Sequence, residues 1–270
     1  MVKTYHYTID EVAPYINWLY FFHAWGLAGK PQGEKDKLRA EAELMLKEMS
    51  HRYHTHAIAG VYEANADGDD ILIDGQRFPM LRQQRKQGEG QPNLCLADFI
   101  RPIGQGRTDR IGAFAATVDR SMETDYRHDD YQRMLAQTLA DRLAEATTEK
   151  MHLEVRRTLW GYAPDECLGI DQLLAEQFQG IRPAVGYPSM PDTSMNFLLD
   201  RLLHFSTIGI RLTTAGAMLP HASTSGLMFA HPQARYFELG KIDSVQLADY
   251  ARRRGVPVGV MRQFLAACVQ

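Results

Sequence analysis

The stretch GIRPAVGYPSMPD, at residues 180–192, places an arginine and a tyrosine in a backbone stiffened by three prolines. Arg182 and Tyr187 each precede a proline, which restricts them to extended conformations and narrows the direction of their side chains. A guanidinium can bind a carboxylate through two hydrogen bonds, and an aromatic face can lie against a sulfonium cation. Gly186 permits a turn, or a close approach of another group to the backbone. The pattern fits either a rigid structural turn or a loop that holds an amino-acid ligand.

Two other polar groups have the residue types of metal sites but not the spacing. The sequence HRYHTH contains His51, His54 and His56, whose separations match neither one face of a helix nor a common zinc pattern. The acidic run at 67–70 lacks the distal glutamate of a calcium-binding loop. We therefore predict no metal site, and we interpret the acidic run as a polar turn.

A further polar group lies in DRLAEATTEKMH, at residues 141–152. Asp141 and Glu145 are four residues apart and so share one face of a helix, and His152 follows Glu145 by seven. The default interpretation is a solvated face of a helix. A role in a site depends on which other segments lie beside it.

Several common functional classes are not indicated. The sequence has no Walker A loop, no G-x-G-x-x-G fingerprint after a strand and no G-x-S-x-G elbow. The cysteines at 95, 167 and 268 are far apart and odd in number, which argues against a disulfide framework and favours reduced thiols. The net charge of −3 does not indicate the basic surface that binds nucleic acid.

The length and composition indicate one domain with a substantial core, because 45% of the 270 residues are hydrophobic. The N-terminus lacks the apolar core of a secretory signal. The most apolar stretch, 18–29, is shorter than the roughly twenty residues of a membrane span. We expect a cytoplasmic protein with no membrane association, in which segment 18–29 is buried.

The elements that must position these residues are predicted from apolar periodicity. Helices are expected at 34–50, from about 128 to 160, and at 170–178, 197–205, 245–254 and 258–269, with Gly255 as a stop. Strands are expected at 57–64, 70–74, 94–100, 110–118, 208–214, 225–230 and 235–240. Because the strands come in runs, we expect an α+β fold around a mostly antiparallel sheet.

The proline-rich loop and nine further segments together resemble one known family. IRPAVGYPSMPD is similar to the R-P-A-x-G-Y-P-x-x-P motif of the activation, or reactivation, domain of cobalamin-dependent methionine synthase, which binds S-adenosylmethionine. The other segments, in the family's order, are FFHAWGLAGK, GDDI, LRQQ, CLADFI, HDDY, LADRLAEA, WGYAPDE, HPQARYF and DYARRRG. The resemblance implies a single C-shaped α+β domain over residues 1–270, with helices flanking a twisted, mostly antiparallel sheet.

The resemblance also implies a role in a methyl transfer. In the family, the domain presents S-adenosylmethionine to cobalamin that has been oxidised out of the catalytic cycle. One-electron reduction, typically by flavodoxin, regenerates the Co(I) nucleophile, which takes the methyl group. The domain contributes mainly by placing the sulfonium methyl opposite the metal, so it is a component of a methyltransferase and has no catalytic residue of its own.

Carried over to this sequence, the resemblance implies a set of ligand-binding residues. Arg182 would bind the methionyl carboxylate, and the backbone around Ala184 would meet the adenine or ribose. Tyr187 and Tyr236 would wall the pocket, and Glu145 would place an acid near the sulfonium. The full candidate set is Asn17, Glu145, Arg182, Ala184, Gly186, Tyr187, Tyr236 and Phe237.

Several positions depart from the family's pattern. Asn17 stands where the family has an aspartate, so the ligand's ammonium would lose a counter-charge while keeping a hydrogen-bond acceptor. Thr193 stands where the family has a histidine that meets the cobalamin side. Thr214 and Ala215 stand in place of the glutamate and serine of L-T-E-S, and Phe237 in place of a frequent second tyrosine. The arginine loop is retained, whereas the acidic and cobalamin-facing groups are fewer.

Three functions are left open by the sequence. The first is a free-standing activation module that acts on a separate cobalamin-binding methionine synthase chain, expected because the sequence begins with the family's N-terminal region and ends after its last helix. The second is a non-catalytic module that senses S-adenosylmethionine or serves a corrinoid protein as a chaperone or regulator. The third is a degenerate domain that binds neither ligand. The loop would also accept the carboxylate of a different adenosyl ligand.

Overall fold

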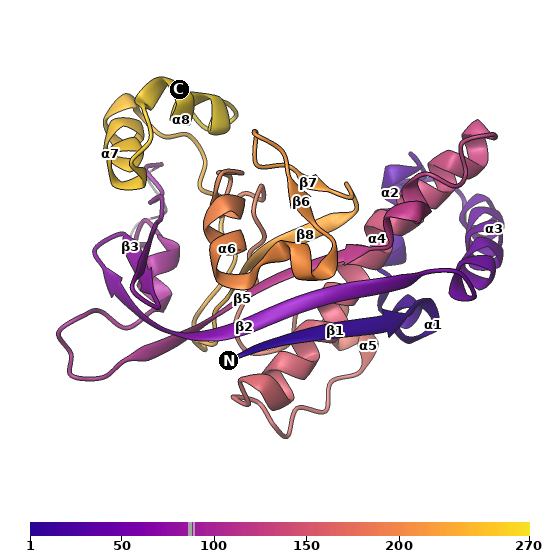
Figure 1. Ribbon diagram of the computed structural model, residues 1–270, viewed down its shortest axis with the longest axis horizontal. Helices are drawn as coiled ribbons and strands as arrows, with labels where there is room; N and C mark the ends of the chain where they lie inside the picture. Colours follow the sequence, from indigo (N-terminus) through magenta and orange to yellow (C-terminus); the bar gives the residue numbers. More distant parts are fainter. Residues whose placement is uncertain (86–87, 89) are drawn as a thin grey trace.

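A computed structural model describes residues 1–85, 88 and 90–270, and its central feature is an antiparallel sheet with helices on both faces (Figure 1). The strands of this sheet follow the order β4-β3-β2-β5-β8, and β1 also pairs with β2. Their bounds are β1 (Val2–Thr8), β2 (His54–Asp67), β3 (Asp70–Ile73), β4 (Gln76–Pro79), β5 (Asp109–Val118) and β8 (Ser223–Met228). A separate ribbon consists of β6 (Arg211–Leu212) and β7 (Met218–Leu219).

Strand β2 organises the sheet because it is long enough to pair with three other strands. Residues 54–60 pair with β1, and residues 64–67 pair with β3 along the same edge. Residues 55–64 pair with β5 along the opposite edge. Neighbouring strand residues point to opposite faces, so Phe114 enters one hydrophobic core and Ala115 enters the other.

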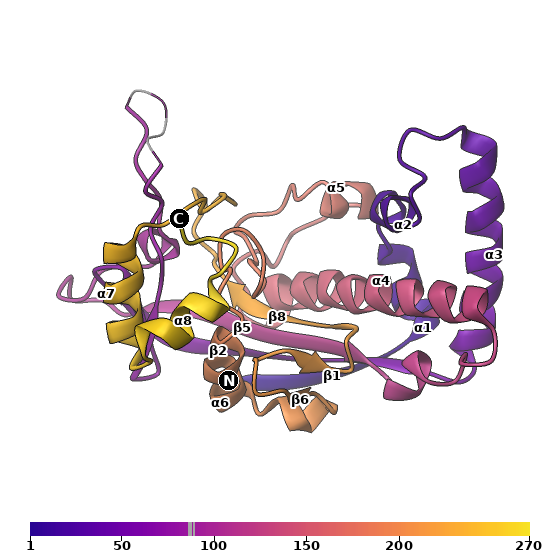
Figure 2. The same ribbon diagram turned by 90° about the horizontal axis from the view of Figure 1, so that it is seen from above.

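The helices separate into two layers and one end group. The structure shows α1 (Ile9–Val12), α2 (Trp18–Ala24), α3 (Gln32–Ser50), α4 (Asp130–Glu154), α5 (Ile170–Leu174), α6 (Met195–Leu203), α7 (Ser244–Arg254) and α8 (Val258–Phe264). Helix α4 runs along one face of the sheet and α6 lies on the other, while α7 and α8 pack together at one end (Figure 2). The predicted α+β fold, C-shaped and built on a twisted antiparallel sheet flanked by helices, is confirmed.

Capping interactions explain where α4 begins, and where α7 begins and ends. The side chain of Asp129 accepts a hydrogen bond from the backbone N–H of Gln132 at 2.8 Å and so starts α4. The helix continues through a π-helical turn, Val155–Leu159. Asp243 caps α7 in the same way, and Gly255, at φ +65°, ends it as predicted.

Some predicted elements are wrong or shorter than expected. Segment 94–100 contains a short 3-10 helix (Leu96–Phe99), because the Asp98 carboxylate accepts the N–H of Cys95 and turns the chain. Residues 235–240 form no strand, and in 208–214 only β6 is a strand. The predicted helix at 170–178 stops at Leu174, and Glu176 adopts a left-handed φ of +55°.

The apolar segment 18–29 is not a buried segment, contrary to the prediction. Within it Phe21 alone is buried, whereas Leu19 and Tyr20 are 60% and 56% exposed. Helix α2 lies at the surface and buries one stripe of its side chains, which is typical of an amphipathic helix. None of the helices in the described ranges is long and apolar enough to cross a membrane.

Candidate functional site

The proline-rich loop is built onto the edge of the sheet. Ile181 and Phe229 exchange backbone hydrogen bonds of 3.0 and 2.8 Å, and the N–H of Val185 donates to Ser225 at 2.9 Å. The loop therefore continues the sheet beyond β8 as an irregular extra strand. Gly226 makes this approach possible, since a Cβ there would lie 2.2 Å from the carbonyl oxygen of Pro183.

A tight turn at 186–190 projects the tyrosine of the loop outward. Gly186 adopts a φ of +89°, and its N–H donates to the carbonyl of Met190 at 2.8 Å. Tyr187 is 53% exposed, and its hydroxyl donates to Glu145 of α4 at 3.1 Å. The sequence-predicted pair of loop tyrosine and helix glutamate is thus in contact.

Arg182 is held beneath this turn between the loop and α4. Its side chain is 12% exposed and forms an ion pair with Glu149. Burial opposes its charge, but the carboxylate of Glu149 raises the pKa of Arg182, so the side chain is a cation. Its Nε has no hydrogen-bond partner, and its backbone N–H donates to the hydroxyl of Tyr236 at 3.0 Å.

The face of α4 that meets the loop carries further polar groups. Glu145 pairs with Arg142 at 2.8 Å. His152 is fully buried, and burial together with the charges of Arg156 and Arg182 lowers its pKa well below the ordinary value, so the imidazole is neutral. Among the described residues, the buried polar atoms without a partner include Arg142 Nε, both ring nitrogens of His152, Arg156 Nη1 and Arg182 Nε.

Unpartnered buried polar atoms are rare in folded proteins, and their concentration in one place indicates a missing water or ligand. Two of them, Arg142 Nε and Arg182 Nε, belong to side chains at the boundary between α4 and the proline-rich loop, whereas Arg156 pairs with Glu166. This boundary therefore holds a fixed cation with an unpartnered donor, Arg182 Nε, and exposed aromatic groups at the rim. It is suited to a ligand that carries a carboxylate.

Comparisons with known proteins identify the family of the chain. Residues 8–255 match the model of a family described as the activation domain of vitamin B12 dependent methionine synthase. The chain belongs to this family. It also resembles a solved structure described as the MetH reactivation domain bound to AdoHcy, with 37% identity and a TM-score of 0.93. That alignment covers 100% of this chain and 90% of the other.

Two acidic residues of this activation domain, Glu149 and Glu176, are absent from the sequence-predicted set, and Glu149 forms the ion pair with Arg182 described above. Burial raises the pKa of Glu176, the charge of Arg182 lowers it, and that of Glu149 raises it. Glu176 therefore lies close to the central ion pair, although it follows α5 in the sequence. Its backbone adopts a left-handed φ of +55°, and the sequence gives no signal for its position beside this ion pair.

The remaining candidate residues of the activation domain make other contacts. Ala184 packs against the core beside α4, and its backbone bridges to Gly226. Phe237 packs against the core on the opposite face of the sheet. The Asn17 side chain accepts the N–H of Leu19 at 3.1 Å and caps α2, a role that an aspartate would fill equally well.

Three of the positions that depart from the family's pattern lie close together. The hydroxyl of Thr193 donates to the carbonyl of Ala215 at 3.4 Å, and Thr214 is the exposed neighbour. A Cβ built on Gly186 would lie 4.0 Å from Cγ2 of Thr193, so this surface adjoins the turn of the proline-rich loop. The replaced histidine and glutamate thus belong to one patch.

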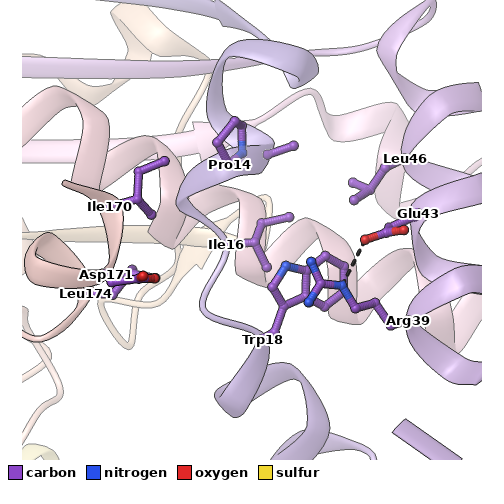
Figure 3. Close-up of a pocket in the computed structure, with 10 residues that line it drawn as sticks. Pro14, Ile16, Trp18, Arg39, Glu43, Leu46, Ile170, Asp171 and Leu174 are labelled. Atoms are coloured by element: carbon purple, nitrogen blue, oxygen red, sulfur yellow. Dashed lines mark hydrogen bonds and ion pairs between the residues drawn. The ribbon is translucent and has the colours of Figure 1, made fainter. Parts of the chain in front are cut away.

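A separate cleft of about 410 Å³ lies among α2, α3, α5 and the 3-10 turn Ala13–Tyr15 (Figure 3). The guanidinium of Arg39 covers the ring of Trp18 at 4.6 Å and pairs with Glu43 at 2.8 Å. The charges of Arg39 and Glu43 thus already neutralise each other, and the guanidinium also packs on the Trp18 ring. The lining contains no residue of the proline-rich loop, so we do not assign the candidate site to this cleft.

Proposed function

We propose that this activation domain binds S-adenosylmethionine between the proline-rich loop and α4, and presents its methyl group to cobalamin held by methionine synthase. The observation that carries the proposal is Arg182, a buried cation with an unpartnered Nε beside Tyr187 and Tyr236. The solved relative bound to AdoHcy supports an adenosyl ligand of this type.

The charges of the site suit this ligand. S-adenosylmethionine carries a carboxylate, an ammonium and a sulfonium, so its net charge is positive. Arg182 would bind the carboxylate, while Glu145, Glu149 and Glu176 surround the cationic part with negative charge. Tyr187 would lie against the sulfonium or the adenosyl group.

The residues of this chain act by binding and orientation. The cobalamin, when bound by its partner, supplies the Co(I) nucleophile. The rigid loop holds the ligand in one pose, which lowers the entropic cost of bringing the methyl group to the metal. No side chain is required as an acid or base, because the methyl group passes between sulfur and cobalt without a proton transfer.

The partner assignment extends the same proposal. We infer a cobalamin-binding methionine synthase chain as the partner, and flavodoxin or an equivalent one-electron donor as the source of reducing equivalents. The test mixes this chain, a reductant and S-adenosylmethionine with an inactivated synthase that lacks its own activation domain. Restored turnover is expected. No recovery, with binding of S-adenosylmethionine intact, would leave the non-catalytic module as the function.

Binding itself is tested by calorimetric titration with S-adenosylmethionine. Arg182→Ala alone would leave the Glu149 carboxylate without its cation. The test therefore uses Arg182→Ala combined with Glu149→Gln. Glu149→Gln alone is the matched control. Loss of a charge-assisted contact costs about 1.5–3 kcal/mol, so the double variant should bind about ten- to a hundredfold more weakly than the control. Equal affinities of the two variants would exclude Arg182 as the carboxylate ligand.

A non-catalytic binding module is the second candidate. It is favoured by the patch of Thr193, Thr214 and Ala215, which lacks the family's histidine and glutamate next to the loop. Its signature would be binding of S-adenosylmethionine without methylation of Co(I). The reactivation assay above separates the two candidates.

A further inference from the structure

A pair of histidines lies outside the proposed ligand site, on the central strands of the sheet. His6 of β1 and His56 of β2 are directly opposite each other in the antiparallel register. Directly opposite residues share a face of the sheet, with Cβ atoms about 5 Å apart. Their Nδ1 atoms are 2.8 Å apart, so the two rings converge through the same nitrogen.

A carboxylate fixes the orientation of one of these rings. Asp119, just beyond the end of β5, lies 2.9 Å from Nε2 of His56 and accepts the backbone N–H of His54 at 2.7 Å. A carboxylate can only accept hydrogen bonds. His56 therefore donates through Nε2–H, and its Nδ1 carries a lone pair.

We propose that His6 and His56 bind a divalent transition-metal ion through their Nδ1 atoms, with Asp119 orienting His56. At metal–nitrogen distances of about 2.0–2.1 Å, two ligands at a right angle are about 2.9 Å apart, close to the observed separation. A right angle is typical of the tetragonal sites of Cu²⁺ and Ni²⁺ rather than of tetrahedral zinc. A carboxylate on the outer nitrogen of a metal-binding histidine is the usual supporting group.

The surroundings leave room for the remaining ligands. The two histidines and Asp119 line an open cleft of about 270 Å³, together with Thr207 and Gly209. Among the described residues, no group of three or more His, Cys, Asp or Glu side chains is arranged to hold a metal, so water would complete the coordination. Arg120 also lines the cleft, and its charge limits the affinity. The site would be a weak, exchangeable one.

Binding requires one proton to move and both rings to turn, because in the hydrogen-bonded pair the two Nδ1 atoms point at each other. In the metal-free pair, His6 donates its Nδ1–H to the lone pair of His56. When the metal binds, His6 transfers that proton to its own Nε2 through solvent, which is possible because His6 is exposed. The HRYHTH motif thus contributes only His56, and its partner comes from β1, so spacing within the motif could not reveal the pair.

The test is calorimetric titration of the tag-free chain with Ni²⁺, followed by electron paramagnetic resonance of the Cu²⁺ complex. One Ni²⁺ should bind, and the Cu²⁺ spectrum should show coupling to two nitrogens. His6→Ala and His56→Ala should each abolish this binding, and Asp119→Asn should weaken it about 10- to 100-fold. His51→Ala, in the same motif but at the end of α3, should have no effect.

Circular dichroism of each variant would show that the fold is kept. Absence of Ni²⁺ and Cu²⁺ binding by the wild-type chain, or binding by His6→Ala and His56→Ala as tight as that of the wild type, would overturn the proposal and leave the pair as a hydrogen bond between strands. Binding of S-adenosylmethionine should be unchanged in these variants, because the metal site does not depend on the proposed function.

Discussion

At the scale of single residues, the structure explains which site residues the sequence could reveal. Arg182, Tyr187 and Glu145 were identifiable because prolines restrict the loop and helical spacing places the glutamate on one face. Glu149 and Glu176 were not, because a charged residue on a helix face or after a short helix usually faces solvent. The pairing of Arg182 with Glu149 arises only when the loop packs against α4.

The raised pKa of Glu176 makes a pH-dependent prediction. Burial raises its folded-state pKa, so the folded protein retains this proton to higher pH than the unfolded chain. Stability is therefore lost as pH rises from the unfolded-state pKa, about 4.3, through the folded-state value. Glu176→Gln should remove this loss.

The measurement is urea unfolding between pH 4 and pH 8. Glu176→Gln should be more stable than the wild type at pH 7, and the two curves should converge near pH 4. The matched control is Glu238→Gln, because Glu238 is exposed like Glu176 but is not among the charged groups that act on Arg182; it should follow the wild type throughout. A Glu176→Gln variant that is less stable at pH 7 would show that attraction to Arg182 outweighs burial.

At the scale of elements, periodicity predicted most helices and strands but not the irregular segments. The helix at 130–154 and the strands at 54–67 and 109–118 have long periodic patterns, and they match their predictions closely. The segment at 235–240 has the residue types of a strand, yet its backbone bonds to two separate segments. The N–H of Leu239 donates to the carbonyl of Pro188 in the proline-rich loop, and the carbonyl of Glu238 accepts from the side chain of Gln83. These partners are distant in sequence, so the local pattern could not identify them.

The packing of the proline-rich loop against β8 depends on one glycine, Gly226. A Cβ at position 226 would lie 2.2 Å from the carbonyl oxygen of Pro183 and 2.9 Å from Cα of Ala184. Gly226→Ala should therefore force the loop away from β8, destabilise the protein by about 1–3 kcal/mol and weaken ligand binding. Urea unfolding and calorimetric titration would measure the two effects.

A matched glycine gives the control for this prediction. Gly33 lies in α3, and a Cβ there would meet nothing within 4 Å. Gly33→Ala should therefore stabilise the protein by about 0.5–1 kcal/mol and leave ligand binding unchanged. Equal stability of the two variants would mean that the loop can shift without cost.

At the scale of the whole molecule, the C-terminal helices are tied to the end of the proline-rich loop. Asp192 is buried and accepts a hydrogen bond from the hydroxyl of Tyr250 at 2.8 Å. Arg254 pairs with the same carboxylate at 3.4 Å and donates to Ser194 at 2.7 Å. Through these contacts, the packing of α7 helps to hold the loop in place.

Substitution of Arg254 tests how much this contact with Asp192 stabilises the protein. Arg254→Ala leaves Asp192 buried without its cation, and such changes cost about 3–5 kcal/mol. Arg252→Ala, on the same helix but 74% exposed, should change stability by less than about 0.5 kcal/mol. The free energy of unfolding in urea measures both. Similar values for the two variants would show that the buried pair contributes little.

The patch beside the loop gives a test, at the scale of the whole molecule, of the proposed action on a cobalamin partner. Thr193 lies between the Gly186 turn and Ala215, where the family pattern has its histidine. Thr193→His should add a partner-facing hydrogen bond, worth about 1 kcal/mol, and raise the rate of cobalamin methylation about fivefold. The affinity for S-adenosylmethionine should not change, because the side chain of Thr193 bonds to Ala215 and not to Arg182 or Tyr187.

The control is Thr214→Ser, a conservative change in the same patch, which should leave both the methylation rate and the affinity unaltered. If Thr193→His altered the affinity but not the rate, the patch would face the bound ligand rather than the cobalamin partner.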